Sequence, residues 1–178
     1  MKEITLQRLG SNDAIPEAVK STYLGAFPEE ERRDWDDIAA RVSAGDLIFS
    51  LYLIRNNGDP VGFVTTWRLP DALYVEHLAV YPDKRSGGIG SAVLAEIADI
   101  AAGKPVVLEI ELPETSDDAR RRIDFYTRNG FTAMDQYPYF QPPYRPGGPT
   151  VPLMLMVTSP LPDPDKFVIM LHTLVYNQ

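Results

Sequence analysis

Polar and apolar residues alternate near the start of the chain and again through its middle third. This two-residue period predicts strands, one over residues 4–9 and three in succession within residues 46–82. The turn sequence "NNGD" is a strong hairpin signal and "LPDA" is a weaker one, and together they divide the longer stretch. The three successive strands therefore predict an antiparallel meander.

Apolar residues at helical spacing predict helices over residues 11–27, 35–45, 89–102, 116–130 and 163–178. Asn12 or Asp13 is expected to cap the first helix, with Pro16 in its first turn. The charged run at 29–33 is expected to be a solvated helix start, with a substrate-facing loop as the alternative. The last helix is expected to pack on the core, with a contact to another subunit as the alternative.

The segment "KPVVLEIELP", residues 104–113, is apolar at nearly every second position and follows the helix at 89–102. It is expected to pair in parallel with the strand before that helix, through a right-handed crossover. Residues 131–140 and 150–157 predict a closing pair of strands. The fold class is therefore α/β in the α+β sense, with a mixed, mostly antiparallel sheet.

The length of 178 residues and the apolar content of 44% predict one domain over residues 1–178. The net charge of -8 disfavours nucleic acid and membrane surfaces as partners and favours a cationic or amine-bearing one. The absence of cysteine and the separation of the two histidines predict neither disulfides nor a metal site. No signal peptide or apolar run of spanning length is evident, so a cytoplasmic location is expected.

A glycine-rich bend, "RSGGIG" at residues 85–90, separates a predicted strand from the helix at 89–102. A helix N-terminus offers unpaired N–H groups and the positive end of the helix dipole, so it stabilises an anion. Gly87, Gly88 and Gly90 let successive amides point into one concavity, and Arg85 adds charge at its rim. A plain turn that uses glycine for its dihedral freedom is the alternative. The spacing fits neither a P-loop nor a dinucleotide fingerprint.

The pattern R-x-x-G-x-G in this bend resembles the acetyl-CoA-binding motif of the GNAT superfamily of N-acetyltransferases. A second segment, "RRRIDFYTRNGF", resembles the late helix of that family, which ends in Tyr-x-x-x-Gly-Phe, here residues 126–131. The two motifs have the order and separation that the family uses. The resemblance covers residues 2–157 and leaves 158–178 as a C-terminal helical extension.

The resemblance implies a GNAT fold, with about seven strands, helices on both faces and a V-shaped splay between the fourth and fifth strands. It also implies acetyl-CoA as the acyl donor, with its diphosphate on the amides of residues 85–91 and its pantetheine arm beside residues 78–80. The implied cofactor-binding residues are Leu78, Ala79, Val80, Arg85, Ser86, Gly87, Gly88, Ile89, Gly90 and Ser91. Ala119 stands where the family's late helix often begins with Asn, a departure that bears on one pantetheine contact.

Acyl transfer from a thioester to an amine needs a neutral amine, a donor to the carbonyl oxygen and a proton for the leaving thiolate. Strand alternation in "LYVEHLAVYP" places Tyr74, Glu76 and Leu78 on one face and Val75, His77 and Ala79 on the other. The resemblance places a side-chain base at Glu76 or Tyr74. We predict Glu76, acting directly or through a water, with pairing to an arginine across the sheet as the alternative. His77 is expected to be a packed histidine, and the N–H of Val80 to donate to the thioester oxygen.

Charge is unusual on the next strand, where Glu109 and Glu111 alternate with apolar residues, and either is a candidate for lining the acceptor site. For Glu111 a solvated strand end is the alternative. Tyr126 resembles the family residue that protonates the departing thiolate, with an ordinary packed aromatic as the alternative. Four later aromatic residues are expected either to wall the acceptor pocket or to pack on the surface: Tyr137, Tyr139, Phe140 and Tyr144.

These features predict an N-acetyltransferase in which a primary amine attacks acetyl-CoA directly within a ternary complex, since the chain has no cysteine nucleophile. The acceptor is expected to be a small-molecule or peptide amine, and the acidic chain points to a cationic one. The sequence leaves open whether the protein forms a homodimer. The alternatives are a CoA-binding sensor or protein-interaction module without turnover, and a transferase that uses another acyl-CoA donor.

Overall fold

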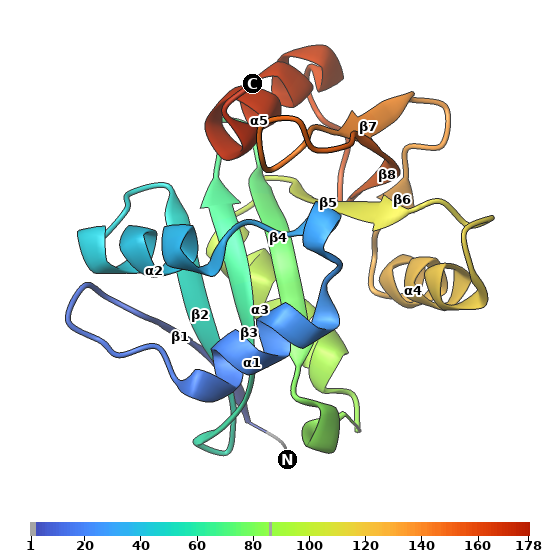
Figure 1. Ribbon diagram of the computed structural model, residues 1–178. Coiled ribbons are helices and arrows are strands. Elements are labelled where there is room, and N and C mark those ends of the chain that lie inside the picture. The colour runs from blue at the N-terminus through green and yellow to red at the C-terminus, as the bar shows by residue number, and fades with distance from the viewer. Residues whose placement is uncertain (1–2, 86) are drawn as a thin grey trace.

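A single sheet runs through the centre of the molecule, with helices on both of its faces (Figure 1). The computed structural model describes residues 3–85 and 87–178. The strands are β1 (Ile4–Arg8), β2 (Phe49–Asn56), β3 (Asp59–Arg68), β4 (Leu73–Val80), β5 (Val106–Glu111), β6 (Thr132–Ala133), β7 (Tyr139–Gln141) and β8 (Val151–Val157). The helices are α1 (Glu17–Ala26), α2 (Trp35–Ala44), α3 (Ile89–Ala101), α4 (Asp117–Arg128) and α5 (Pro164–Tyr176), with 3-10 helices η1 (Glu29–Glu31) and η2 (Pro82–Lys84).

The strand order is β1-β2-β3-β4-β5-β8-β6, and β7 also pairs with β8. Within the described residues β4 and β5 form the one parallel pair, and the other pairs are antiparallel. This arrangement confirms the predicted mixed, mostly antiparallel sheet.

Two apolar clusters lie on opposite faces of this sheet. The first joins α1 and α5 to the sheet through residues such as Val19 and Phe167, and the second joins α3 through residues such as Val93. Side chains alternate along a strand, so neighbouring residues of β3 serve different clusters, Phe63 the first and Val64 the second. The prediction that the last helix packs on the core is confirmed.

Two element boundaries differ from the predictions. Pro16 takes the N-cap position of α1 rather than its first turn, and the Asp13 carboxylate binds a backbone amide ahead of the helix. The predicted strand at 131–140 is interrupted by a turn in which the Tyr137 amide donates to the Met134 carbonyl. The segment therefore contributes two short strands, β6 and β7, instead of one.

A β-bulge shifts the register between β3 and β4. Thr65 pairs with His77 and the next residue of β3 pairs with Val75, so Glu76 has no partner on β3. The extra residue resets the alternation of side chains. Glu76 and His77 both lie on the α1 side of the sheet, and Leu78 joins the α3 side. The prediction that Glu76 shares a face with Leu78 and lies opposite His77 is therefore wrong.

The sheet opens between β4 and β5. The two strands pair only over Leu73–Val75 with Val106–Leu108. Beyond this point each strand continues without pairing to the other, β4 as far as Val80 and β5 as far as Glu111. The C-terminal halves of the strands thus frame an opening at the place where the V-shaped splay is predicted.

Candidate active site

The glycine bend forms a concave surface at the N-terminus of α3. Gly88 caps the helix with a φ of 78°, in the left-handed region that favours glycine, and among the described residues no side chain caps the first turn. The first-turn amides have no partner within the helix and are available to an anion in a cavity of about 280 Å³. The cavity is lined by Val80, Arg85, Gly87, Gly88, Ile89, Gly90, Ser91 and Phe125. The predicted Ser86 lies outside the described residues.

A groove of about 530 Å³ continues from this concave surface toward the opening in the sheet. Its lining residues are Leu78, Val80, Arg85, Asp118, Arg121, Arg122, Phe125 and Tyr126. Gly90 allows α3 and α4 to approach here, because a Cβ at that position would lie 2.9 Å from the Phe125 ring. Three arginines and one carboxylate, Asp118, line the groove, and Arg121 pairs with Asp118. The excess of positive charge suits phosphate groups.

The backbone of β4 offers a donor to the opening. The Tyr81 amide donates to the Val61 carbonyl of β3 at 2.8 Å. Successive N–H groups of a strand point to opposite sides, so the Val80 N–H points away from β3 and toward the opening. This orientation fits the predicted role of Val80 as the donor to the thioester oxygen.

A cavity of about 280 Å³ fills the opening between β4 and β5. It shares Leu78, Arg122 and Tyr126 with the groove, so the two cavities adjoin each other. Of the predicted catalytic and substrate residues, it brings together Glu76, Glu109, Glu111 and Tyr126. We call it the acceptor pocket.

Glu76 has a completely buried side chain, and protein groups occupy both of its oxygens. Arg33 donates from Nε and Nη2 to Oε1 at 3.0 and 2.7 Å, and the Tyr144 hydroxyl donates to the same oxygen at 3.1 Å. Trp67 Nε1 donates to Oε2 at 2.9 Å. Burial by itself would raise the pKa of Glu76, but the charge of Arg33 holds that pKa well below its usual range. This environment argues against Glu76 as the base. It agrees with the alternative that Glu76 pairs with an arginine, although Arg33 lies in the segment between η1 and α2 and not across the sheet.

Glu109 lies in a different environment, in which its partners are neutral. The hydroxyls of Tyr74 and Tyr176 donate to Oε2 at 3.0 and 2.6 Å, and the Tyr139 hydroxyl donates to Oε1. Burial raises the pKa of Glu109 to about 6, and the three phenols limit that rise. A carboxylate with this pKa can accept and release a proton near neutral pH.

The other two predicted residues of the pocket connect it to α4. Glu111 forms an ion pair with Arg122. Tyr126 packs edge-on against Phe125 and Phe131, with ring centroids 5.2 and 5.5 Å apart. Burial raises the pKa of Tyr126 to about 12, against the opposing charge of Arg122, so the phenol stays protonated at neutral pH.

Tyr137, Tyr139 and Ala79 do not line the acceptor pocket, whereas His77 does. The Tyr137 hydroxyl donates to Asp165 of α5 at 2.7 Å, and Tyr137 is not among the residues that line the acceptor pocket. Ala79 packs in the cluster on the α1 side and not in the groove. His77 packs edge-on against Tyr23 with ring centroids 5.0 Å apart, which agrees with the prediction of a packed histidine.

Arg33 and Tyr176 build the site without having been singled out in the sequence. Arg33 belongs to the charged run expected to be solvated, and its side chain is almost fully buried. One signal was available for it, because a charge within a strand, here Glu76, needs a partner of opposite sign. Tyr176 lies on α5, and no periodicity distinguishes it from the apolar residues around it.

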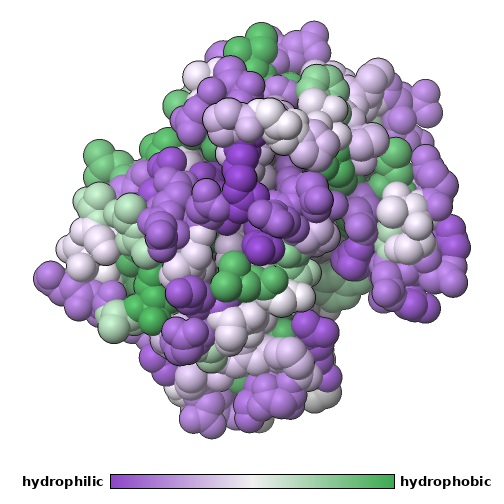
Figure 2. Space-filling model, viewed as in Figure 1, coloured by the Kyte–Doolittle hydropathy of each residue, from purple (hydrophilic) through white to green (hydrophobic). Residues whose placement is uncertain are grey.

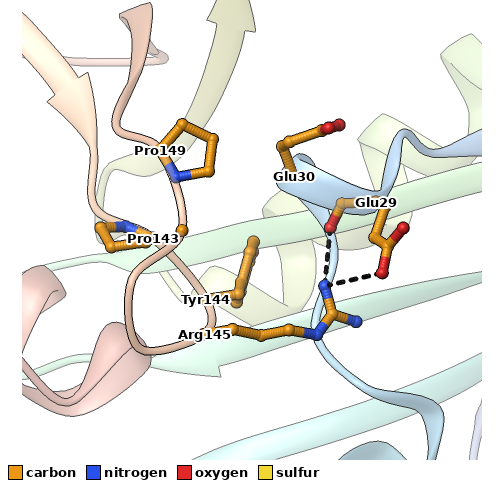
Figure 3. A pocket seen from close by; sticks show the side chains of 7 residues that line it. Glu29, Glu30, Pro143, Tyr144, Arg145 and Pro149 are labelled. Atoms are coloured by element: carbon orange, nitrogen blue, oxygen red, sulfur yellow. Dashed lines mark hydrogen bonds and ion pairs between the residues drawn. The ribbon is translucent and has the colours of Figure 1, made fainter.

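A further cavity of about 210 Å³ lies beside the acceptor pocket, between η1 and the loop that follows β7 (Figure 3). Tyr144 lines both cavities. Arg145 Nη1 donates to the Glu29 carbonyl at 3.0 Å, and Arg145 Nε donates to Asp34 at 2.9 Å. These bonds hold the loop, and Tyr144 with it, against the segment that carries Arg33. The face of the molecule in Figure 2 is mainly hydrophilic, with separate hydrophobic patches at its centre and left side.

Comparison with known proteins identifies the arrangement. The model of the acetyltransferase (GNAT) family matches residues 12–131. This chain belongs to the GNAT acetyltransferase family. A solved GNAT-family acetyltransferase structure from Bacteroides thetaiotaomicron is 34% identical, with a TM-score of 0.83 over 91% of this chain and 92% of that one. No curated protein sequence gives a significant match.

More distant structures share the fold. A GNAT family acetyltransferase from Elizabethkingia anophelis, solved with acetyl-CoA bound, is 18% identical with a TM-score of 0.58, covering 88% of this chain and 98% of that one. The IAA acetyltransferase from Bacillus cereus is 18% identical with a TM-score of 0.54, covering 87% and 97%.

This GNAT protein is therefore an acyltransferase, and acetyl-CoA is the acyl donor. The bend and groove fit that donor, because available amides and arginines suit its diphosphate and the groove leads past Val80 to the acceptor pocket. No helix within residues 3–85 and 87–178 is long and apolar enough to cross a membrane. In the same residues no group of three or more His, Cys, Asp or Glu side chains could hold a metal ion.

Proposed function

We propose that this GNAT protein acetylates a primary amine by direct attack within a ternary complex, with Glu109 as the base. The observation that carries the proposal is a partly buried carboxylate that lines the acceptor pocket, accepts from three phenols and has a pKa of about 6. Glu109 would take the proton of the incoming ammonium group, directly or through a water. No cysteine exists in the chain to form an acyl-enzyme through a thiol, which favours direct attack.

Two other groups complete the proposed chemistry. Acetyl-CoA supplies an acetyl group activated as a thioester. The Val80 N–H would bind the carbonyl oxygen, and Tyr126 would give its proton to the leaving sulfur from its place where groove and pocket meet. A phenol with a pKa of about 12 is a weaker acid than ideal at neutral pH, so Tyr126 is expected to contribute less than Glu109.

The pocket favours a cationic acceptor. Three carboxylates line it at Glu31, Glu109 and Glu111, in addition to the buried Glu76, and Arg122 compensates one of them. Burial raises the pKa of Glu31, whose charge an ammonium group would stabilise. The net charge of -8 would also steer cations toward the molecule.

The test is release of free thiol from acetyl-CoA with a panel of polyamines, amino acids, aminoglycosides, peptides and neutral amines. Cationic amines are expected to be acetylated in preference to neutral ones. For the best acceptor, Glu109→Gln is expected to lower kcat by about 10²–10⁴-fold, the usual loss when a general base is removed. Tyr126→Phe is expected to lower kcat by a smaller factor.

Calorimetric titration with CoA is the control, because Glu109→Gln leaves the bend and groove intact and should bind CoA as wild type does. Wild-type turnover by Glu109→Gln would refute the base assignment. Tight CoA binding without turnover of any amine would instead support a binding module, and turnover with another acyl-CoA would revise the donor.

A further inference from the structure

Helix α5 lies outside the region that matches the family model, yet its last turn reaches Glu109. Tyr176 is buried, and its hydroxyl donates to Glu109 Oε2 at 2.6 Å. Tyr74 donates to the same oxygen, and the two hydroxyls are 3.2 Å apart. The oxygen is therefore held by two phenols, one from β4 and one from α5.

The last turn of α5 is fixed in place by two kinds of contact. Val175 in this turn and Leu171 one turn earlier are buried in the cluster on the α1 side of the sheet. Arg33 Nη2 donates to the Val175 carbonyl at 2.9 Å, so the guanidinium that pairs with Glu76 also anchors the helix end. The Tyr176 hydroxyl is thereby preorganised rather than free to rotate away.

We propose that Tyr176 is a positioning residue for the acyl transfer: its hydroxyl orients the Glu109 carboxylate and stabilises the ionised form. The proposal rests on the proposed function of Glu109 as the base. Tyr176 would act through Glu109 and touch neither acetyl-CoA nor the amine.

The charges around Glu109 show why a neutral donor matters. The titratable groups that face it are Tyr74 and Glu76 of β4, Tyr139 of β7, Tyr144 of the following loop and Tyr176 of α5. Glu76 is the charged member of this set, and its negative charge disfavours a second carboxylate. Burial keeps the pKa of Tyr176 well above its usual value, so its hydroxyl remains a donor over the working pH range. Removing it takes one stabilising hydrogen bond from ionised Glu109.

The direct test is carbon-13 NMR titration of protein labelled at the glutamate carboxyl carbon, with the Glu109 signal assigned by its loss in Glu109→Gln. Wild-type Glu109 is expected to titrate near pH 6. Tyr176→Phe keeps the ring and is expected to raise that pKa by about one unit. In acetylation assays the same variant should lose roughly fivefold in kcat/KM at pH 6 and little at pH 8, as the ionised fraction of a base with a raised pKa dictates.

Tyr137→Phe is the matched control. It removes another phenol–carboxylate hydrogen bond that involves α5, the one to Asp165, with no contact to Glu109. The Glu109 pKa should stay at its wild-type value in that variant. The proposal is overturned if Tyr176→Phe titrates as wild type does, even where Glu109→Gln abolishes turnover. A shifted pKa together with full turnover by Glu109→Gln would refute the base assignment, and the positioning role with it.

Discussion

Glu76 and Glu109 lie on the two strands that frame the same opening. The Glu76 side chain is fully buried and Glu109 is partly buried, and the two carboxylates differ in the kind of partner provided. Glu76 meets a guanidinium, an indole N–H and a phenol. Glu109 meets three phenols and no cation among the described residues. The pKa of Glu76 is consequently far below its usual range, whereas the pKa of Glu109 is about 6.

This difference separates a structural carboxylate from a candidate catalytic one. A carboxylate that is fully paired with a cation contributes to the fold, and its low pKa keeps it from taking up a proton near neutral pH. A charge that only neutral donors stabilise is held near the point of protonation, which is where general bases operate. Strand position alone does not distinguish the two residues, because both line the same pocket.

The largest expected effect is on stability, from Glu76→Gln. It removes the buried charge opposite Arg33 and leaves the partly exposed Asp37 as the remaining carboxylate on that buried guanidinium, which should cost about 3 kcal/mol in the free energy of unfolding. Because the folded-state pKa of Glu76 is lowered, its contribution is complete above the unfolded value of 4.5 and is lost as pH falls. Urea denaturation at pH 7 and at pH 4 should therefore show a smaller difference from wild type in acid.

A matched control uses the exposed ion pair of the same pocket. Glu111 and Arg122 keep side-chain exposures of 24% and 51%, so Glu111→Gln should cost less than about 1 kcal/mol. Equal losses for the two glutamine variants would contradict the view that Glu76 is a structural carboxylate.

The next largest effect should have the opposite sign. The pKa of Glu109 rises from 4.5 to about 6 on folding, so the folded state binds more protons and the ionised carboxylate destabilises it above pH 6. Glu109→Gln is therefore expected to stabilise the protein by about 1–2 kcal/mol at pH 8. The gain should disappear below pH 4.5, where both states of wild type are protonated. Thermal unfolding at the two pH values measures it, and a loss of stability at pH 8 would show that Glu109 is paired more strongly than its contacts indicate.

The smallest effect concerns a single phenol. Tyr144→Phe removes one of the donors to Glu76 and should cost about 1 kcal/mol, uniformly between pH 6 and 8. The matched removal at Glu109 is Tyr176→Phe, whose effect should depend on pH over the same range. Denaturation curves of both variants at several pH values compare the two carboxylates directly, and a pH-dependent loss for Tyr144→Phe would contradict the comparison.

Much of the fold followed from local patterns. The strand alternation of the meander and the helical spacing at residues 89–102 and 116–130 are properties of neighbouring residues, and each appears in the structure. The bulge at Glu76 could not be predicted, because it depends on how β3 and β4 register with each other. An unbroken alternation therefore assigned His77 to the wrong face.

The site was predictable only in part, for the same reason. The bend and Tyr126 carry motifs in sequence, and Glu109 stood out as a charge on an apolar strand. Arg33 and Tyr176 are far apart in the sequence. They come together in the site because Arg33 donates to the carbonyl of Val175, the residue before Tyr176 at the end of α5. Contacts of such long separation arise from tertiary packing, which no single-sequence period encodes.

The bulge at Glu76 also sets a rule for engineering the acceptor pocket. The side chains at positions 76 and 77 both lie on the α1 side of the sheet. A library that varies every second residue along β4 would therefore change from one face of the sheet to the other at this point. Deleting one residue there would restore the regular alternation of side chains and move every later side chain of the strand to the opposite face of the sheet. The lining of the acceptor pocket therefore depends on one inserted residue in β4 as well as on the side chains.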